Sequence, residues 1–200
     1  MNDTVSFGYE DIDATEKTGR VGEIFSSVAS KYDIMNDAMS GGMHRLWKNR
    51  FVSRVKPQPG EQILDMAGGT GDIAFRMADK GASVTVSDIN QDMLDVGIER
   101  AMERGIDGLV WSCQNAEELT FSSRTFDAYT IVFGIRNVTY IDKALKEALG
   151  QLHDSASEYA ADQSGANDPR CGVVQPITVA DGEALNDALR RAAALLEKKP

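Results

Sequence analysis

A glycine-rich loop with an acidic residue on either side is the stretch of this sequence best suited to chemistry. The segment LDMAGGTGD (64–72) breaks an apolar run with three glycines, and Asp65 precedes them. Asp88 ends the next apolar segment, ASVTVSD (82–88). Glycines allow a tight turn and a close approach of the backbone to a ligand, and an acid after the second strand suits a ribose diol. The spacing therefore predicts a nucleotide-binding loop between a strand and a helix.

Two kinds of nucleotide fit this loop to different degrees. The residues Gly69-x-Gly71-x-x-Ala74 match the dinucleotide fingerprint, so an NAD-dependent oxidoreductase is compatible with the sequence. Asp65 argues against a dinucleotide, because its carboxylate would repel a pyrophosphate on the following helix. S-adenosylmethionine carries no phosphate and offers an ammonium and a sulfonium, which a carboxylate attracts. The loop therefore favours S-adenosylmethionine as the cofactor, with the following binding candidates: Asp65, Gly68, Gly69, Gly71 and Asp88.

The segments around this loop alternate between strand and helix patterns. Short apolar runs predict four strands, at 62–67, 82–88, 108–114 and 126–133. Helical spacing of apolar residues predicts helices at 72–80, 90–105 and 140–150. This alternation is typical of an α/β fold with helices on both faces of a parallel sheet, and right-handed crossovers make it a doubly wound, Rossmann-like sheet. We expect the four strands in the order 3-2-1-4.

The two ends of the chain differ from this central part. Residues 1–18 are acidic and polar, and we expect them to be mobile. A central domain is expected at 19–150, opening with two helices that break near 40–42. Residues 151–200 form a divergent tail. Its expected parts are a polar linker at 151–170, a strand at 171–180 that Pro176 confines to an edge or a bend, and a helix at 181–200.

The composition narrows the class of protein and its partners. The chain has 200 residues, 42% of them apolar and 26% charged, which is ordinary for a soluble protein. Its net charge of −10 argues against a nucleic-acid partner. Cys113 and Cys171 are too few for a disulfide framework or a metal cluster, so we expect no metal. The sequence shows neither the apolar core of a secretory signal nor the ~20 apolar residues of a membrane span. We expect a cytoplasmic protein, and leave open both its oligomeric state and a peripheral contact with the inner membrane.

Several longer stretches resemble one family of enzymes. They are SSVASKYDIMNDAMSGGMHRLWKNRFV, ILDMAGGTGDIAFRMA, DINQDML, NAEEL and FSSRTFDAYTIVFGIRNVTYIDKAL, within residues 19–149. These segments are similar to the ubiquinone/menaquinone biosynthesis C-methyltransferases, the UbiE/MenG family. The resemblance implies a class I methyltransferase, in which a Rossmann-like sheet is joined to N-terminal helices. It also implies transfer of a methyl group from S-adenosylmethionine to a ring carbon of a polyprenylated benzoquinol or a demethylmenaquinol.

The resemblance assigns donor-binding roles to individual residues. It implies that Thr70 in the glycine loop, Asp88 after the second strand, and the pair Asn115 and Ala116 after the third strand bind the methyl donor. Asp88 would accept hydrogen bonds from the ribose, while Asn115 and the backbone of Ala116 would face the adenine edge. Some members of the family place a serine before the Phe-Gly of FGIRN. This chain has Val132 there, so a hydroxyl contact at that position is lost.

Methylation of a quinol carbon requires groups that handle protons. The phenol must lose its proton to make the ring carbon electron-rich, the methyl group must arrive in line about 3 Å away, and a ring proton must then leave. The segment FGIRN follows the fourth strand, at the sheet edge where ligands bind in open α/β folds. We expect Arg136 to favour the phenolate by proximity and Asn137 to orient a water that takes the proton. Tyr32 and His44, on helices that resemble a lid, are further candidates.

The resemblance stops near residue 150. The family continues with an RVLKPGG turn, a fifth strand and an antiparallel pair, patterns that this sequence lacks. A four-stranded sheet would leave its fourth strand as an open apolar edge, which the segment VVQPITVA (173–180) is placed to cover. Three functions stay open. They are a C-methyltransferase with a lipophilic quinol substrate, a truncated and inactive remnant that binds S-adenosylmethionine, and, less favoured, the oxidoreductase.

Overall fold

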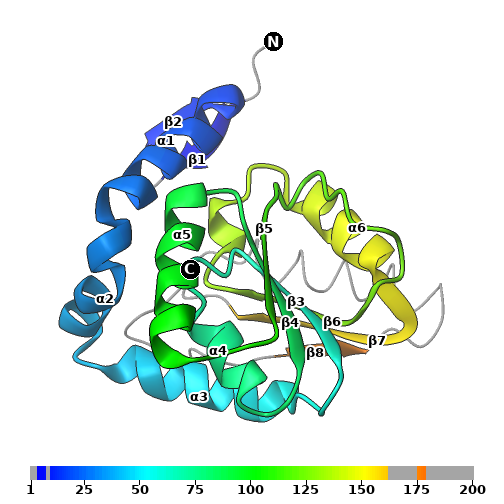
Figure 1. The fold of residues 1–200 in the computed structure, drawn as a ribbon. Helices are drawn as coiled ribbons and strands as arrows, with labels where there is room; N and C mark the ends of the chain where they lie inside the picture. Colours follow the sequence, from blue (N-terminus) through cyan, green and yellow to red (C-terminus); the bar gives the residue numbers. More distant parts are fainter. Residues whose placement is uncertain (1–3, 8–9, 162–174, 179–200) are drawn as a thin grey trace.

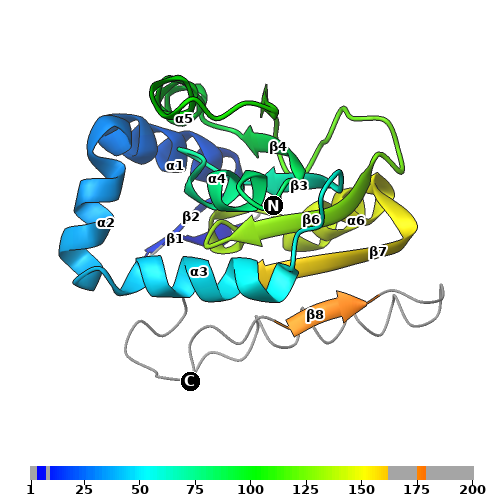
Figure 2. The same ribbon diagram turned by 60° about the horizontal axis from the view of Figure 1, so that its bottom comes forward.

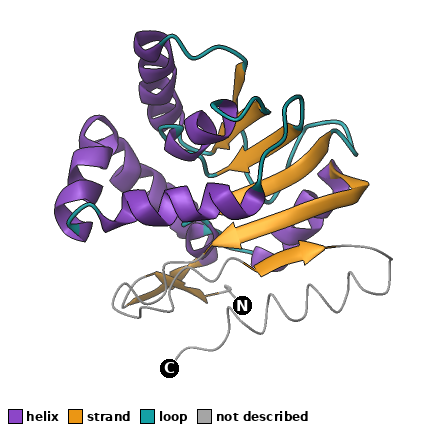
Figure 3. Cartoon of the chain, turned by 90° about the horizontal axis from the view of Figure 1, so that it is seen from below, coloured by secondary structure: helices purple, strands orange, loops and turns teal. Residues whose placement is uncertain are grey.

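A six-stranded sheet organises the chain. The computed structural model describes residues 4–7, 10–161 and 175–178 (Figure 1). The strands are β3 (Gln62–Met66), β4 (Ser83–Asp88), β5 (Leu109–Cys113), β6 (Phe126–Val132), β7 (Leu152–Ala161) and β8 (Gln175–Thr178). They lie side by side in the order β5-β4-β3-β6-β7-β8, and only β8 runs antiparallel to its neighbour. Figure 3 shows the strands in orange. The four predicted strands and their order are confirmed.

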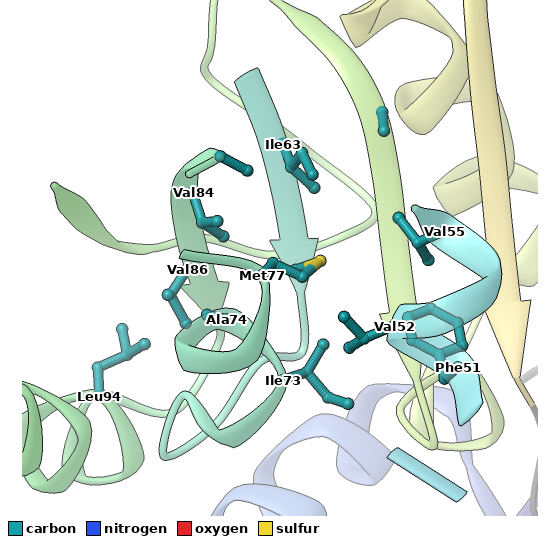
Figure 4. Packing of buried hydrophobic residues seen from close by; sticks show 12 residues of the cluster. Phe51, Val52, Val55, Ile63, Ile73, Ala74, Met77, Val84, Val86 and Leu94 are labelled. Atoms are coloured by element: carbon teal, nitrogen blue, oxygen red, sulfur yellow. The ribbon is translucent and has the colours of Figure 1, made fainter. Parts of the chain in front are cut away.

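Helices cover both faces of this sheet, as predicted. They include α4 (Asp72–Ala78), α5 (Gln91–Arg104) and α6 (Ile141–Gln151). On one face Ile63 and Val84 pack with Ile73 and Met77 of α4 (Figure 4). On the other face Leu64 belongs to a second cluster, which contains residues of α6. Neighbouring residues of one strand thus enter opposite clusters, as the two-residue period of a strand requires.

Three helical segments precede the sheet where the sequence predicted two helices. They are α1 (Ala14–Val28), α2 (Tyr32–Ser40) and α3 (Met43–Val55). The predicted break near residues 40–42 is confirmed, because Gly41 and Gly42 have φ of 57° and 81°, which glycine adopts without strain. A further break, the 3₁₀ turn η1 (Ala29–Lys31), was not predicted. Apolar residues have helical spacing on both sides of η1, so the sequence pattern gives no sign that the helix is interrupted there.

The N-terminal segment contains paired strands that the sequence did not indicate. β1 (Thr4–Phe7) and β2 (Glu10–Asp13) pair antiparallel, and α1 begins directly after β2. Regular structure therefore begins well before residue 19. Among the helices that the structure describes, none is long and apolar enough to cross a membrane.

The C-terminal segment departs from the prediction in one respect and agrees in another. The prediction of a polar linker is wrong for residues 152–161, which form β7 beside β6. The backbone of β6 has hydrogen-bonding groups on both edges, and any extended segment can pair with them whatever its side chains. The predicted strand containing Pro176 is confirmed as β8, an edge strand, although it pairs with β7 and not with the fourth predicted strand. The predicted helix at 181–200 lies outside the described residues.

Candidate functional site

A pocket lies at the carboxyl ends of β3, β4 and β6, and α1, α2 and α3 contribute its roof. We call these three helices the roof helices. Nine of the ten predicted site residues line this pocket, namely Asp65, Gly68, Gly69, Thr70, Asp88, Asn115, Ala116, Arg136 and Asn137. Tyr32 and His44, the candidates on the lid-like helices, line it too. The structure therefore brings together residues that the sequence separates by more than a hundred positions.

Gly71, the tenth predicted residue, lies beside the pocket and shapes the loop. It is the N-cap of α4 with φ of 78°, and a Cβ added there would lie 2.6 Å from Cη2 of Trp111. Gly68 is equally crowded, since a Cβ on it would lie 2.7 Å from Cγ1 of Val86. Contacts this short do not occur between real carbon atoms, so the loop can follow this path only with glycine at both positions.

Asp65 lies at the bottom of the pocket as a buried carboxyl group with one oxygen unused. The residue is 1% exposed, and its Oδ1 accepts a hydrogen bond of 2.7 Å from Oγ1 of Thr130. Its Oδ2 has no hydrogen-bond partner among the residues that the structure describes. Burial raises the pKa of Asp65 to about 7, outweighing the hydrogen bond from Thr130 and the attraction of Lys48. A buried acceptor of this kind fits a cationic donor group such as an ammonium.

Asp88, at the end of β4, fixes the glycine loop through a backbone hydrogen bond. Its Oδ2 accepts the N–H of Gly69 at 2.9 Å, and its Oδ1 accepts the N–H of Asn90 at 2.9 Å. Burial raises the pKa of Asp88, against the lowering effect of these backbone donors. Each carboxylate oxygen can still accept a second hydrogen bond, so the group retains capacity for a pair of hydroxyls.

Asn90 is a pocket residue that the sequence analysis missed. Its Oδ1 caps α5 by accepting the N–H of Met93 at 3.1 Å. Its Nδ2 donates to the backbone oxygen of Gly22 and to Oγ of Ser26, both at 2.9 Å and both on α1. An asparagine before a helix is recognisable from sequence as an N-cap. The second role, which ties α1 over the strand that ends at Asp88, depends on contacts between distant segments.

Asn115 and its neighbours form the third side of the pocket. Oδ1 of Asn115 accepts the N–H of Glu117 at 3.0 Å, which is a local turn. The NH₂ group of this side chain can donate to a ligand, and its Oδ1 can still accept one further hydrogen bond. Glu117 in turn accepts the N–H groups of Thr139 and Tyr140 at 2.8 and 3.0 Å. The loop after β5 is thereby joined to the loop after β6.

Two further contacts attach the roof helices to the sheet domain. Nζ of Lys48 on α3 lies 2.9 Å from Oδ2 of Asp72, the first residue of α4. Burial alone would raise the pKa of Asp72, but the nearby charges of Lys48 and Arg76 outweigh it and hold that pKa below its ordinary value. Nζ of Lys17 on α1 donates to the backbone oxygen of Val138 at 3.0 Å. These buried lysines explain how a charged helix surface can close a pocket.

Arg136 and Asn137 lie on the 3₁₀ turn η2 (Ile135–Asn137), which follows β6. Arg136 is exposed and Asn137 half-buried. Just before η2, Phe133 has a positive φ of 63°, and Ala67 at the end of β3 has 53°. Both of these residues line the pocket. Positive φ at residues other than glycine is strained and concentrates at functional sites, so the backbone here supports the prediction that this edge binds a ligand.

The fold and this pocket define a Rossmann-like α/β domain with a ligand site at the carboxyl ends of its parallel strands. Phosphoethanolamine N-methyltransferase 1 of Haemonchus contortus, solved with S-adenosylhomocysteine, superposes with a TM-score of 0.64 at 11% identity, over 76% of this chain and 33% of that one. YcgJ of Bacillus subtilis gives 0.57 at 20% identity, over 60% and 51%. The [4+2]-cyclase SpnF gives 0.63 at 21% identity, over 86% and 70%. Because a cyclase shares the fold, the fold alone does not determine the reaction.

Sequence comparison identifies the particular family. The ubiE/COQ5 methyltransferase family matches residues 13–160, and the chain belongs to this family. The ubiquinone/menaquinone biosynthesis C-methyltransferase UbiE of Zymomonas mobilis is 62% identical over 144 residues, which are 72% of this chain and 60% of that protein. UbiE of Brucella canis is 56% identical over 149 residues, 72% of this chain and 55% of that protein. The predicted resemblance is confirmed, and the chain spans somewhat more than half the length of these relatives.

Proposed function

We propose that this chain binds S-adenosylmethionine and methylates a ring carbon of a reduced polyprenylated quinol, as the names of its relatives indicate for ubiquinone and menaquinone biosynthesis. The observation that carries the proposal is Asp65. Its buried Oδ2 has no partner among the described residues and lies in a pocket together with the glycine loop and Asp88. A pyrophosphate would add negative charge beside this carboxyl, whereas the amino group of S-adenosylmethionine would neutralise it.

Different residues of the pocket would bind different parts of the methyl donor. Asp65 would accept a hydrogen bond from its amino group, and Asp88 would accept from its ribose hydroxyls. The NH₂ group of Asn115 and the backbone of Ala116 would face its adenine ring. Thr70, which is buried in the glycine loop, would contact the donor from the same loop. Each of these residues lines the one pocket, so a single ligand can reach all of them.

The chemistry of the acceptor belongs to the turn η2 after β6, which lines the same pocket. When bound, S-adenosylmethionine supplies an electrophilic methyl group. The guanidinium of Arg136 would favour the phenolate form of the quinol by charge proximity, which makes the ring carbon more nucleophilic. Asn137 would orient a water to take the ring proton that leaves. The roof helices would keep bulk water from the reacting atoms and so strengthen both effects.

Calorimetric titration with S-adenosylhomocysteine tests the donor half of this proposal. The expected result is micromolar binding by the chain that weakens at least tenfold in Asp65→Asn and in Asp88→Ala, because each loses a charged hydrogen-bond acceptor worth about 1.5–3 kcal/mol. Asp107→Asn removes an exposed carboxylate remote from the pocket and serves as the matched control. A preference for NADH over S-adenosylhomocysteine would overturn the proposal in favour of an oxidoreductase.

Methyl transfer to a reduced short-chain quinol then tests the acceptor half. We expect turnover that falls in Arg136→Gln and Asn137→Ala while the affinity for S-adenosylhomocysteine stays unchanged. Tight donor binding by a folded chain without any turnover would contradict the catalytic part. It would support the alternative in which this chain is an inactive donor-binding remnant.

A further inference from the structure

The turn η2 carries the two proposed acceptor residues, Arg136 and Asn137, and its own backbone hydrogen bonds close a single 3₁₀ turn. The N–H of Asn137 donates to the oxygen of Gly134 at 2.9 Å, and the N–H of Val138 donates to the oxygen of Ile135 at 3.2 Å. Hydrogen bonds of this type have poorer geometry than those of an α-helix. The strand β6 ends on the side of the sheet where the roof helices lie (Figure 2). The contacts that hold the chain as it leaves η2 therefore help to fix these two side chains in the pocket.

Two charged side chains from distant parts of the sequence hold the residues that follow η2. Nζ of Lys17 donates to the backbone oxygen of Val138 at 3.0 Å. Oε1 of Glu117 accepts the N–H groups of Thr139 and Tyr140 at 2.8 and 3.0 Å. We call residues 138–140 the exit segment. Each of its three consecutive residues thus has a backbone group bonded to a charged side chain, and such hydrogen bonds are stronger than neutral ones.

Lys17 bears a desolvation cost that simple packing does not explain. It is 7% exposed, and burial lowers the pKa of its ammonium group, while the charge of Glu117 acts in the opposite direction. An apolar side chain of similar length would fill the same space without this cost. Because lysine is seldom buried unless it is paired, the hydrogen bond to Val138 and the attraction of Glu117 account for its presence here.

The two side chains join the exit segment to two different walls of the pocket. Lys17 belongs to the roof helix α1, and Glu117 belongs to the loop after β5, which lines the pocket. We propose that Lys17 and Glu117 are positioning residues, which hold the exit segment and thereby keep Arg136 and Asn137 directed at the acceptor. They act through the backbone of the turn. Their importance for turnover rests on the proposed function, whereas their effect on η2 does not.

A purely structural role for Glu117 predicts a different pattern of effects. Tyr140 is the N-cap of α6, and its side chain makes no capping hydrogen bond within the part of the chain that the structure describes. A carboxylate that only satisfies N–H groups at the start of α6 would stabilise that helix alone. Its loss would loosen α6 and leave η2 unchanged. The proposal requires that η2 itself loosens, on the other side of the exit segment along the chain.

Amide hydrogen exchange of the unliganded chain separates these two roles. In Glu117→Ala the N–H groups of Asn137 and Val138 should exchange about fivefold faster or more, although both are bonded within η2 and neither is bonded to Glu117. Glu118→Ala removes a neighbouring exposed carboxylate and should leave both rates within about twofold. Faster exchange confined to α6 and the two residues before it would refute the proposal and assign Glu117 to capping.

Substitution of Lys17 tests the other contact to the exit segment. Lys17→Met keeps a long side chain and removes the donor, so the same two amides should again exchange faster. Arg20→Gln removes a positive charge from an exposed position on the same helix and should not change them. Circular dichroism checks that each variant is folded. Unchanged exchange in folded Lys17→Met would overturn the role of Lys17, and if this variant does not fold, Glu117→Ala still decides the proposal.

Turnover of a reduced short-chain quinol tests the catalytic consequence. In Glu117→Ala kcat should fall about tenfold or more, because small displacements of catalytic groups are costly, while the affinity for S-adenosylhomocysteine should stay within about twofold. Glu117→Gln keeps an oxygen acceptor for the same N–H groups and should restore most of the lost activity. A loss of affinity with unchanged kcat would overturn the proposal and assign Glu117 to donor binding. A wild-type chain that binds no S-adenosylhomocysteine would refute the proposed function, and exchange in η2 would still decide the positioning role.

Discussion

Replacing Asp65 by asparagine tests whether a titrating carboxyl group lies under the glycine loop. Burial raises the pKa of Asp65 from 3.8 to about 7, which corresponds to about 4 kcal/mol by which the folded state disfavours the ionised form. The folded chain therefore binds more protons than the unfolded chain between about pH 4 and pH 7. Stability decreases with pH over that window, since an unfolded state that binds fewer protons gains as pH rises.

The expected magnitude follows from these two pKa values. Between pH 5 and pH 8 the wild-type chain should lose about 2–3 kcal/mol of unfolding free energy that Asp65→Asn does not lose. Urea titrations of both proteins at the two pH values measure this difference, and contributions from groups that do not interact with Asp65 cancel in the comparison. Asp107→Asn serves as the control and should follow the wild type. An unchanged difference between wild type and Asp65→Asn at the two pH values would refute the burial argument.

The same titration should appear in ligand binding. With a pKa of about 7, Asp65 is roughly one tenth ionised at pH 6 and three quarters ionised at pH 7.5, so S-adenosylhomocysteine should bind about eightfold more tightly at the higher pH. Asp65→Asn should bind weakly at both pH values. Affinity that is independent of pH in the wild type would mean that the carboxylate does not receive the amino group.

Other contacts give predictions that mutagenesis can check in the same unfolding assay. Gly71→Ala should cost about 1–3 kcal/mol more than Gly105→Ala, because both residues have positive φ but only Gly71 lacks room for a methyl group. Asn90→Ala should cost about 1–2 kcal/mol and speed hydrogen exchange in α1, whereas Asn90→Asp keeps the cap and loses only the tie to α1. Lys48→Met should cost about 1–3 kcal/mol at pH 7. That loss should shrink towards pH 3, because the lowered pKa of Asp72 contributes stability only where the carboxyl is ionised.

Local patterns predicted the part of the fold in which strands and helices alternate. Ile63 and Leu64 enter clusters on opposite faces of the sheet, and such strand periodicity is visible in the sequence. The strand β7 was missed because LHDSASEYAA has only two large apolar residues, Leu152 and Tyr159, and no alternation. Its pairing supplies hydrogen-bond partners for the backbone N–H and C=O groups of β6. The strand therefore forms because β6 needs a neighbour, and the side chains of β7 do not signal it.

Some residues of the site were predictable from the sequence and others were not. Asp65 and Asp88 were predictable because parallel strands end at one edge of the sheet, so residues after different strands must meet there. Asn90, Lys48 and Lys17 were missed as site residues because their roles depend on how the roof helices pack on the sheet. No spacing within one helix contains that information.

Several features of the pocket destabilise the folded chain and have no structural purpose of their own. Asp65 is held in a place that disfavours its charge, and Ala67 and Phe133 adopt positive φ at the ends of the adjacent strands β3 and β6. Strain of this kind persists where the surrounding structure enforces it, and it commonly marks a ligand site. A cationic group beside Asp65 would relieve the largest of the three. Ligand binding should therefore stabilise this domain most at neutral and higher pH, where the unliganded chain bears the full penalty of the buried charge.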